Sequence, residues 1–77
     1  MEELLEYLAR ALVDDPDKVT IERFDEDDGS VVLELSDGEE DYGKVIGRGG
    51  RTANALRTVL KAAAVKEQCR VFVDIVD

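Results

Sequence analysis

Apolar residues along the chain recur with two periods, one typical of helices and one typical of strands. Over residues 1–13 and again over residues 51–67 they return every three or four positions, which predicts two amphipathic helices. The expected core stripe of the first helix is Met1, Leu4, Leu5, Leu8, Ala11 and Leu12. The expected core stripe of the second is Thr52, Ala53, Leu56, Val59, Leu60 and Ala63.

Three β-prone runs lie between and after these helices, at residues 18–24, 31–35 and 70–76. The middle run is almost continuously apolar, which is typical of a strand at the centre of a sheet. Asp28-Gly29 separates the first two runs and predicts a hairpin. In the last run Val71, Val73 and Ile75 share one face.

A further short helix is predicted over residues 39–46, where acidic residues occupy the first turn and suit the helix dipole. The element order is then αββααβ. The hairpin makes the first two strands antiparallel, and the two-helix crossover normally makes the second and third strands parallel. We therefore expect an α+β fold with a three-stranded mixed sheet of order 1-2-3, three helices packed on one face, and a single domain over residues 1–77.

The turn before the last helix is rich in glycine and arginine. Gly47, Gly49 and Gly50 allow positive φ angles and let a ligand approach the main chain. The following helix begins with unpaired N–H groups and a partial positive charge, and Arg48 and Arg51 add full charges. These features predict a phosphate site, although a helix C-cap and a tight turn would also use glycine here.

The spacing of the glycines narrows the type of phosphate site. A Walker A loop fails, because five positions after Gly43 stands Arg48 and five after Gly47 stands Thr52. A dinucleotide fingerprint fails because its third glycine would also fall on Thr52, and no strand precedes the loop. What remains is G-x-x-G between two helices, which in KH domains clamps the backbone of about four nucleotides.

Charge is segregated along the chain. The net charge of −9 argues against general binding to nucleic acid or to an anionic membrane. Residues 1–43 nevertheless hold sixteen acidic and three basic residues, whereas residues 44–70 hold seven basic residues against Glu67 alone. The basic segment coincides with the glycine turn, which is the charge pattern of a local nucleic-acid site.

Several segments together resemble a known family. The run over residues 41–58, the opening residues 3–8, the turn over residues 13–17 and the stretch 61–64 are similar to the small bacterial KhpA (YlqC-type) proteins, which have a type II KH fold. The resemblance covers the whole chain. It implies a stand-alone cytoplasmic module that binds single-stranded RNA. It also implies a larger KH-containing partner, KhpB, and an RNA-chaperone role linked to cell shape and envelope growth.

The resemblance and the glycine turn together give an expected RNA-binding set: Lys44, Val45, Ile46, Gly47, Arg48, Gly49, Gly50, Arg51, Asn54 and Arg57. For Val45 and Ile46, a place in the core and a place on the groove floor are both open. For Lys44, Arg57 and Lys61, a solvated helix face is an equal alternative.

Small apolar residues outside the expected core stripe of the last helix suggest self-association or pairing with a KH partner. The expected interface residues are Ala55, Thr58, Ala62 and Val65. Helix propensity alone would also place alanine at such positions.

Other function classes find little support in the residues. The chain has no histidine, one cysteine (Cys69) and no metal-ligand set, so we expect no catalytic residue, no cofactor and no small-molecule substrate. The acidic run over residues 25–28 fails the EF-hand spacing and is expected to be a solvated hairpin tip.

The acidic first residues and the lack of a long apolar run predict a cytoplasmic protein without a signal peptide. The competing hypothesis is a KH-fold protein-interaction domain that has lost RNA binding.

Overall fold

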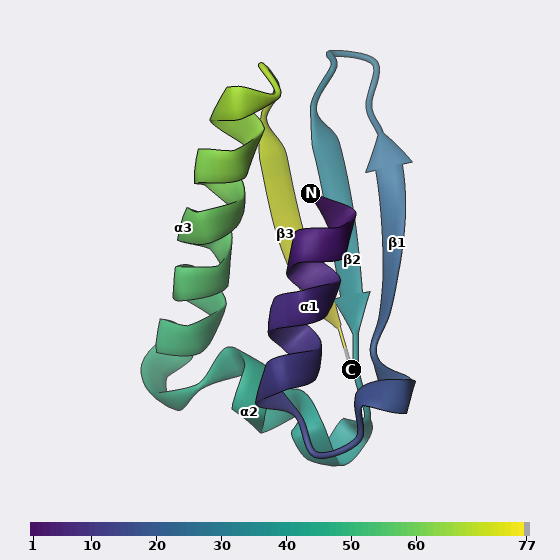
Figure 1. Ribbon diagram of the computed structural model, residues 1–77, viewed down its shortest axis with the longest axis vertical. Coiled ribbons are helices and arrows are strands. Elements are labelled where there is room, and N and C mark those ends of the chain that lie inside the picture. The colour runs from purple at the N-terminus through teal and green to yellow at the C-terminus, as the bar shows by residue number, and fades with distance from the viewer. Residues whose placement is uncertain (77) are drawn as a thin grey trace.

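The helices and strands follow one another in the predicted order (Figure 1). The computed structural model describes residues 1–76. Its main elements are α1 (Glu2–Leu12), β1 (Thr20–Asp25), β2 (Val31–Ser36), α2 (Tyr42–Ile46), α3 (Arg51–Lys66) and β3 (Val71–Val76). Single 3₁₀ turns occupy Pro16–Lys18, Glu39–Asp41 and Arg48–Gly50. The helix predicted over residues 39–46 is therefore a 3₁₀ turn followed by α2.

The sheet has the expected order and directions. Its strands are ordered β1-β2-β3, with β1 antiparallel to β2 and β2 parallel to β3. β2 is central, as its nearly continuous apolar run predicted. The crossover from β2 to β3 passes through α2 and α3, so the glycine turn lies at one end of the molecule, where α3 begins.

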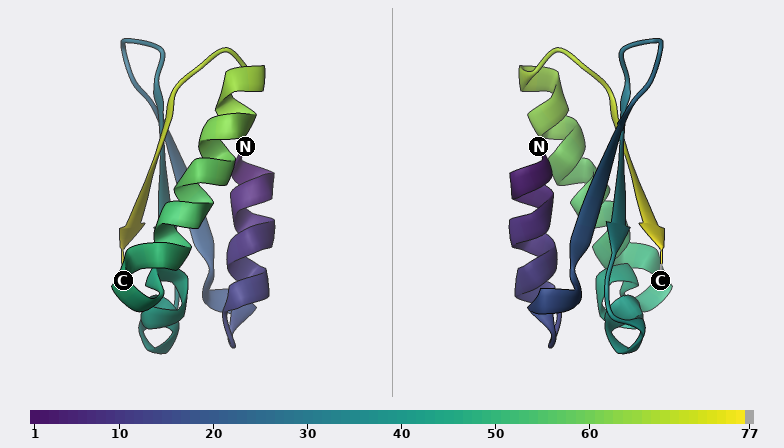
Figure 2. Two further views of the ribbon diagram at one scale, coloured as in Figure 1. Left: turned by 90° about the vertical axis from the view of Figure 1, so that its left-hand side faces the viewer. Right: turned by 90° about the vertical axis from the view of Figure 1, so that its right-hand side faces the viewer.

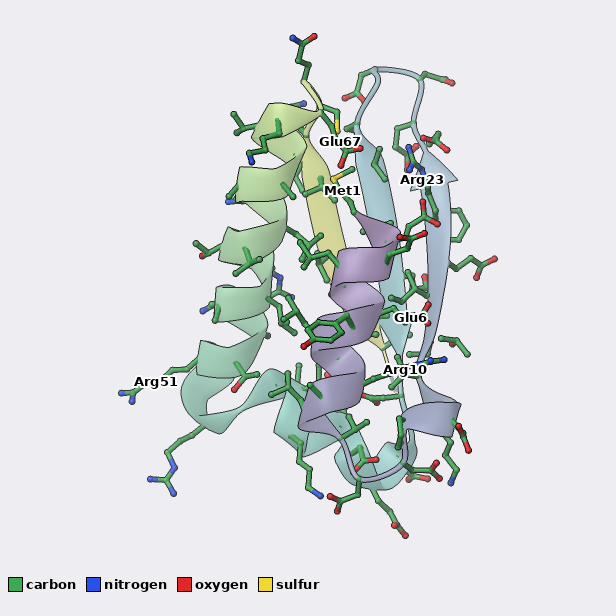
Figure 3. The ribbon with its side chains drawn as sticks, viewed as in Figure 1. Met1, Glu6, Arg10, Arg23, Arg51 and Glu67 are labelled. Atoms are coloured by element: carbon green, nitrogen blue, oxygen red, sulfur yellow. The ribbon has the colours of Figure 1, made fainter. Side chains whose placement is uncertain are left out.

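The helices lie on one face of the sheet, and the other face is open. Figure 2 shows this edge-on, with α1 and α3 side by side against the same face. The N-terminal amine of Met1 lies 3.5 Å from Glu67 Oε2, so the start of α1 is tied to the end of α3 (Figure 3). The predicted α+β architecture is confirmed.

The core is made by alternate strand residues facing the helices. The largest fully buried side chains are Leu5, Leu33, Leu35, Val45 and Leu60. In α1 the predicted stripe is shifted toward the middle of the helix. Leu5 and Ala9 are fully buried, whereas Ala11 and Leu12 are exposed.

The predicted stripe of α3 is wrong in including Val59 and in omitting Ala64. Ala53, Leu56, Leu60 and Ala64 are buried, whereas Val59 is 43% exposed. The two alanines let the helix approach the sheet closely, and this sets its rotation. Val59 then lies on the flank of α3 nearest α1, where it helps to line a groove.

The open face of the sheet carries two rows of side chains that cross all three strands. Val32 pairs with Phe24 on one side and with Phe72 on the other, which makes an apolar row. Glu34 pairs with Glu22 and with Asp74 in the same way, which makes a row of carboxylates. Because Val31, Leu33 and Leu35 face the helices, these neighbours face away from them.

Candidate nucleic-acid interface

The turn between α2 and α3 is held in a conformation that only glycine adopts easily. Gly47 has φ 76° and ψ 171°, Gly49 has φ 63° and ψ 20°, and Gly50 has φ 79° and ψ 10°. The Gly47 N–H donates to the Gly43 carbonyl at 2.8 Å and ends α2, and the Gly50 N–H donates to the Gly47 carbonyl at 3.2 Å. Two short bonds therefore fix a loop of four residues.

Gly47 and Gly49 serve the loop in different ways. A Cβ on Gly47 would lie 2.2 Å from Thr52 Oγ1 and 2.9 Å from the Thr52 nitrogen, so a side chain there would collide with α3. A Cβ on Gly49 would meet no atom within 4 Å. The first glycine lets the loop pack against the helix, and the second leaves the outer surface of the main chain bare.

The start of α3 is open to an anion. Gly50 is its N-cap, and no side chain caps the helix. The first N–H groups of α3 are thus not satisfied by a side chain, and they carry the positive end of the helix dipole. Arg48 and Arg51 are both exposed beside them, and Arg51 extends away from the ribbon into solvent (Figure 3). The arrangement suits a phosphate group.

Lys44 differs from these arginines because it is held in ion pairs. Its ammonium group forms ion pairs with Asp14 and, at 3.5 Å, with Asp41. Asp14, followed by Asp41, raises the pKa of Lys44 above its usual value. The charge predicted for RNA is therefore already engaged by carboxylates of the acidic part of the chain.

Asp41 fixes the segment that leads into the loop. Its side chain is almost fully buried and accepts hydrogen bonds from the backbone N–H of Asp14 at 3.2 Å and of Asp15 at 3.0 Å. Burial alone would raise the pKa of Asp41, but these N–H groups and Lys44 outweigh it and lower the pKa below its usual value. An ionised carboxylate thus holds the turn after α1 against the start of α2.

The two aliphatic residues of the predicted set have different positions. Val45 is fully buried, so its side chain belongs to the core and cannot reach a ligand on the surface. Ile46 is only partly buried at the edge of that core. Val45 supports the loop from below, and Ile46 is the one of the two that a ligand can touch.

Asn54 and Arg57 lie together where α3 faces β3. The Arg57 Nε donates to the Val73 carbonyl at 3.2 Å, and its Nη1 donates to Asn54 Oδ1 at 3.2 Å. β3 is an edge strand, so the Val73 carbonyl is available to α3 rather than to another strand. Arg57 therefore connects α3 to the edge of the sheet, between one and two helical turns beyond the start of α3.

The four residues predicted to form an association surface are all exposed on α3 but do not form one strip. Ala55 lines a groove of about 270 Å³ between α1 and α3, with Leu8, Leu12 and Val59 among its walls. Val65, 75% exposed, lines a different hollow near the start of β3. Thr58 and Ala62 line neither of these two hollows.

No group of three or more acidic, histidine or cysteine side chains among residues 1–76 is arranged to hold a metal ion. No helix within the same residues has the length and apolar character needed to span a membrane.

Comparison with known proteins decides the family. The model of the KhpA/KhpB KH domain matches residues 2–75. The chain belongs to the KhpA/KhpB KH-domain family. Its αββααβ order and mixed sheet are those of a KH domain, as the resemblance implied.

Individual KhpA proteins are similar to the chain over its whole length. The RNA-binding protein KhpA of Clostridium acetobutylicum is 53% identical over 76 residues, covering 99% of this chain and 100% of the relative. That of Halalkalibacterium halodurans is 52% identical over 77 residues, covering 100% of both. That of Bacillus subtilis is 42% identical over 77 residues, covering 100% of this chain and 94% of the relative.

Two structural features of this KhpA/KhpB family member were not predicted from the sequence. One is the Val73 carbonyl at the sheet edge, which the predicted strand order 1-2-3 already made accessible by leaving β3 at an edge. The other is the apolar groove lined by Leu12 and Val59, two residues that the periodicity had assigned to the core. No signal in the sequence separated a core stripe from a groove beside it.

Proposed function

We propose that this chain is a non-enzymatic module that binds single-stranded RNA by clamping its backbone at Gly47–Gly50. The observation that carries the proposal is the loop itself. Its glycines expose the main chain, it leads into a helix start without a side-chain cap, and two exposed arginines flank it. The relatives named RNA-binding protein KhpA support the same function.

Each part of the loop has a role in this proposal. N–H groups of the loop and of the first turn of α3 donate to phosphate oxygens, and Arg48 and Arg51 supply charge. Bases then lie along the side of α3 that faces β3, over Ile46 and beside Asn54 and Arg57. The acidic residues of the first half repel a second strand, which favours single-stranded RNA over a duplex.

A matched pair of double variants tests the clamp. Arg48→Asp with Gly49→Asp places two carboxylates on the phosphate path and should abolish binding to a random-sequence RNA octanucleotide pool. Arg10→Asp with Thr20→Asp adds the same negative charge at two exposed positions, one on α1 and one on β1, outside the loop and outside the α3 side of the sheet edge. Fluorescence anisotropy reports the affinity, and circular dichroism reports the fold.

The control variant should bind as the wild type does. Unchanged affinity in a folded Arg48→Asp, Gly49→Asp protein would overturn the proposal. A wild type that binds no RNA but is captured by a protein partner would favour the alternative of a KH-fold interaction domain.

We also propose that the module acts in the cytoplasm as an RNA chaperone, as a homodimer or with a larger KhpB-type protein, and contributes to cell shape and envelope growth. The apolar groove between α1 and α3 supports association, because Leu12 and Val59 leave apolar surface exposed there. Ala55→Glu would bury an unpaired charge in such an interface and should shift a dimer to monomer. Sedimentation velocity measures this, and Gln68→Glu, which adds the same charge at an exposed site, is the control.

A dimer that persists unchanged in Ala55→Glu would exclude this groove. The same variant pair applied to a mixture with a KhpB-type protein separates the homodimer from the heterodimer.

A further inference from the structure

A second hollow lies at the far end of α3 from the glycine loop. It has a volume of about 370 Å³ and lies between the last turns of α3 and the start of β3. Its walls include Lys61 and Val65 from α3, Phe72 from β3, and Arg70, which directly precedes β3.

The backbone around this hollow is firmly held. The Gln68 N–H donates to the Val65 carbonyl at 3.1 Å, and the Cys69 N–H donates to the Ala64 carbonyl at 3.0 Å. With Gln68 at φ 57°, these two bonds form a Schellman motif that ends α3 and turns the chain directly into β3. The hollow is therefore preformed.

Basic side chains lead from the loop to the hollow. Arg57 and Lys61 are four residues apart, so they lie on the same side of α3, one turn from each other. Arg57 already contacts the edge of β3 at Val73. Lys61 stands ten residues beyond Arg51, which is about 15 Å along the helix. A strand that leaves the loop along this edge meets Arg57, then Lys61, then Arg70.

An aromatic side chain borders the hollow at the sheet edge, where Phe72 of β3 is directed to the open face of the sheet. The Phe72 side chain is 50% exposed, and the Arg70 Cζ lies 5.9 Å from the centre of its ring. Aromatic rings and guanidinium groups are the surfaces on which unpaired bases stack, whatever their sequence. The apolar hollow can thus take a base, and the two cations beside it can take a phosphate.

We propose that the hollow is a second nucleotide-binding site for the same RNA strand, in which a base stacks on Phe72 and Lys61 and Arg70 contact phosphate. The proposal rests on the proposed function, because the strand is anchored at Gly47–Gly50. It extends the contact from one end of α3 to the other, so it predicts that affinity depends on RNA length.

The chain supplies its own control for Phe72. Phe24 lies in the same apolar row, on the opposite side of Val32, and is 42% exposed. Phe24 has Glu22, Asp25 and Glu26 close to it in the chain, and the one basic neighbour, Arg23, is paired with Glu2 and Asp25. Phe72 has Asp74 two positions further along its strand, but the Arg70 guanidinium lies over its ring. An RNA strand should therefore favour Phe72 over Phe24, although the two side chains are similarly exposed.

Two RNA lengths and these two variants test the site. Phe72→Ala should weaken binding to a random-sequence octanucleotide pool about tenfold, as expected for the loss of one stacked base. Binding to a tetranucleotide pool, which the loop accommodates alone, should be unchanged. Phe24→Ala should bind both pools as the wild type does. Equal octanucleotide affinity for folded Phe72→Ala and Phe24→Ala would overturn the proposal.

Amide chemical-shift mapping of the wild type gives a test that no folding defect can obscure. Both pools should shift the amides of residues 48–51, and only the octanucleotide should shift those of Arg70 and Phe72. Shifts in the loop without shifts at Arg70 and Phe72 would overturn the second site and leave the clamp standing. No shifts in either region would overturn the clamp itself.

Discussion

The chain reverses direction at two exposed glycine turns, and the two treat their backbone donors in opposite ways. At the hairpin tip, where Gly29 has φ 86°, the Asp28 carboxylate accepts the Ser30 N–H at 2.9 Å and the Ser30 hydroxyl at 2.6 Å. At the Gly47–Gly50 turn no side chain caps the helix that follows. The hairpin tip is thus capped by a carboxylate of the chain itself, whereas the Gly47–Gly50 turn can bind an anion from a ligand.

This difference shows that glycine alone does not make a phosphate site. Both turns have positive φ angles and bare surfaces, but the side chains beside them decide what each can bind. Acidic residues surround the hairpin tip, whereas Arg48 and Arg51 flank the loop. Experiments that exchange or remove these neighbours therefore probe the function more directly than experiments on the glycines.

The largest expected effect concerns the glycine that packs against α3. For comparison, Gly29→Ala should cost about 1–2 kcal/mol of unfolding free energy, because its φ is left-handed. No collision adds to that cost, since no atom lies within 4 Å of the new Cβ. Gly47→Ala should cost roughly 1–3 kcal/mol more through its collision with Thr52, and it should also displace the loop and abolish RNA binding. Urea denaturation measures both variants, and equal midpoints would contradict this account of Gly47.

Salt dependence should separate the loop from a broad electrostatic surface. With about two or three phosphate contacts at the loop, the logarithm of the affinity for a tetranucleotide should fall by only ~1.4–2 per tenfold rise in salt. Duplex DNA should bind poorly at every salt concentration, because residues 1–43 carry most of the negative charge. Anisotropy titrations across a salt series provide the slope. Tight duplex binding that ignores salt would be incompatible with the proposed clamp.

Acid should reduce the stability that the Asp28 hydrogen bonds give to the hairpin tip, whereas the Gly47–Gly50 turn has no such carboxylate. The Ser30 hydroxyl and N–H, assisted by Arg70, lower the pKa of Asp28 below its usual value. A carboxyl with a lowered folded-state pKa contributes stability above its unfolded pKa, near 4, and this contribution is lost as the pH falls through the folded pKa. The melting temperature should therefore fall as the pH drops below about 4.

Asp28→Asn provides the comparison for that acid titration, because it removes the titrating group and should make the decline shallower. Asp41, whose pKa is also lowered, remains in this variant and should still contribute to the decline. Identical pH profiles of the melting temperature in wild type and variant would rule out a contribution from Asp28.

The smallest expected effect links the hairpin tip with the second hollow. Arg70 lies 3.5 Å from Asp28 across an exposed ion pair, so RNA in the second hollow must compete with that carboxylate. Asp28→Asn should raise octanucleotide affinity about two- to threefold, which corresponds to the strength of an exposed ion pair. Asp17→Asn removes the same charge at an exposed position that has no contact with the hollow. A rise of the same size in Asp17→Asn would mean that only net charge matters.

The sheet could be predicted from the sequence because each of its determinants is local. The apolar run over residues 31–35, the Asp28-Gly29 turn and the two-helix crossover each specify one pairing, and together they leave one strand order. The glycine loop was predicted for the same reason, since its spacing and its arginines are contiguous in the chain.

The sequence did not predict which face of each helix is buried, nor which residues form ion pairs with the charged side chains. In α3, Val59 and Ala64 are both apolar, and only packing against the sheet decides that Ala64 is buried and Val59 is not. The sequence predicts Lys44 to be a free cation beside the loop. It forms an ion pair with Asp14, thirty positions away, and this pair depends on how the segments that carry them are packed. Tertiary contacts between distant residues decide both cases.

The row of carboxylates on the open face of the sheet has a consequence for folding. Glu22, Glu34 and Asp74 are directly opposite one another across the three strands, and like charges in that position destabilise a sheet. Among residues 1–76, none of the three forms an ion pair with a basic side chain. Dissolved ions screen this repulsion within about 8–10 Å at physiological ionic strength, so salt strengthens strand pairing while it weakens contacts to phosphate. The fold is then most secure under the ionic conditions in which RNA is held least tightly.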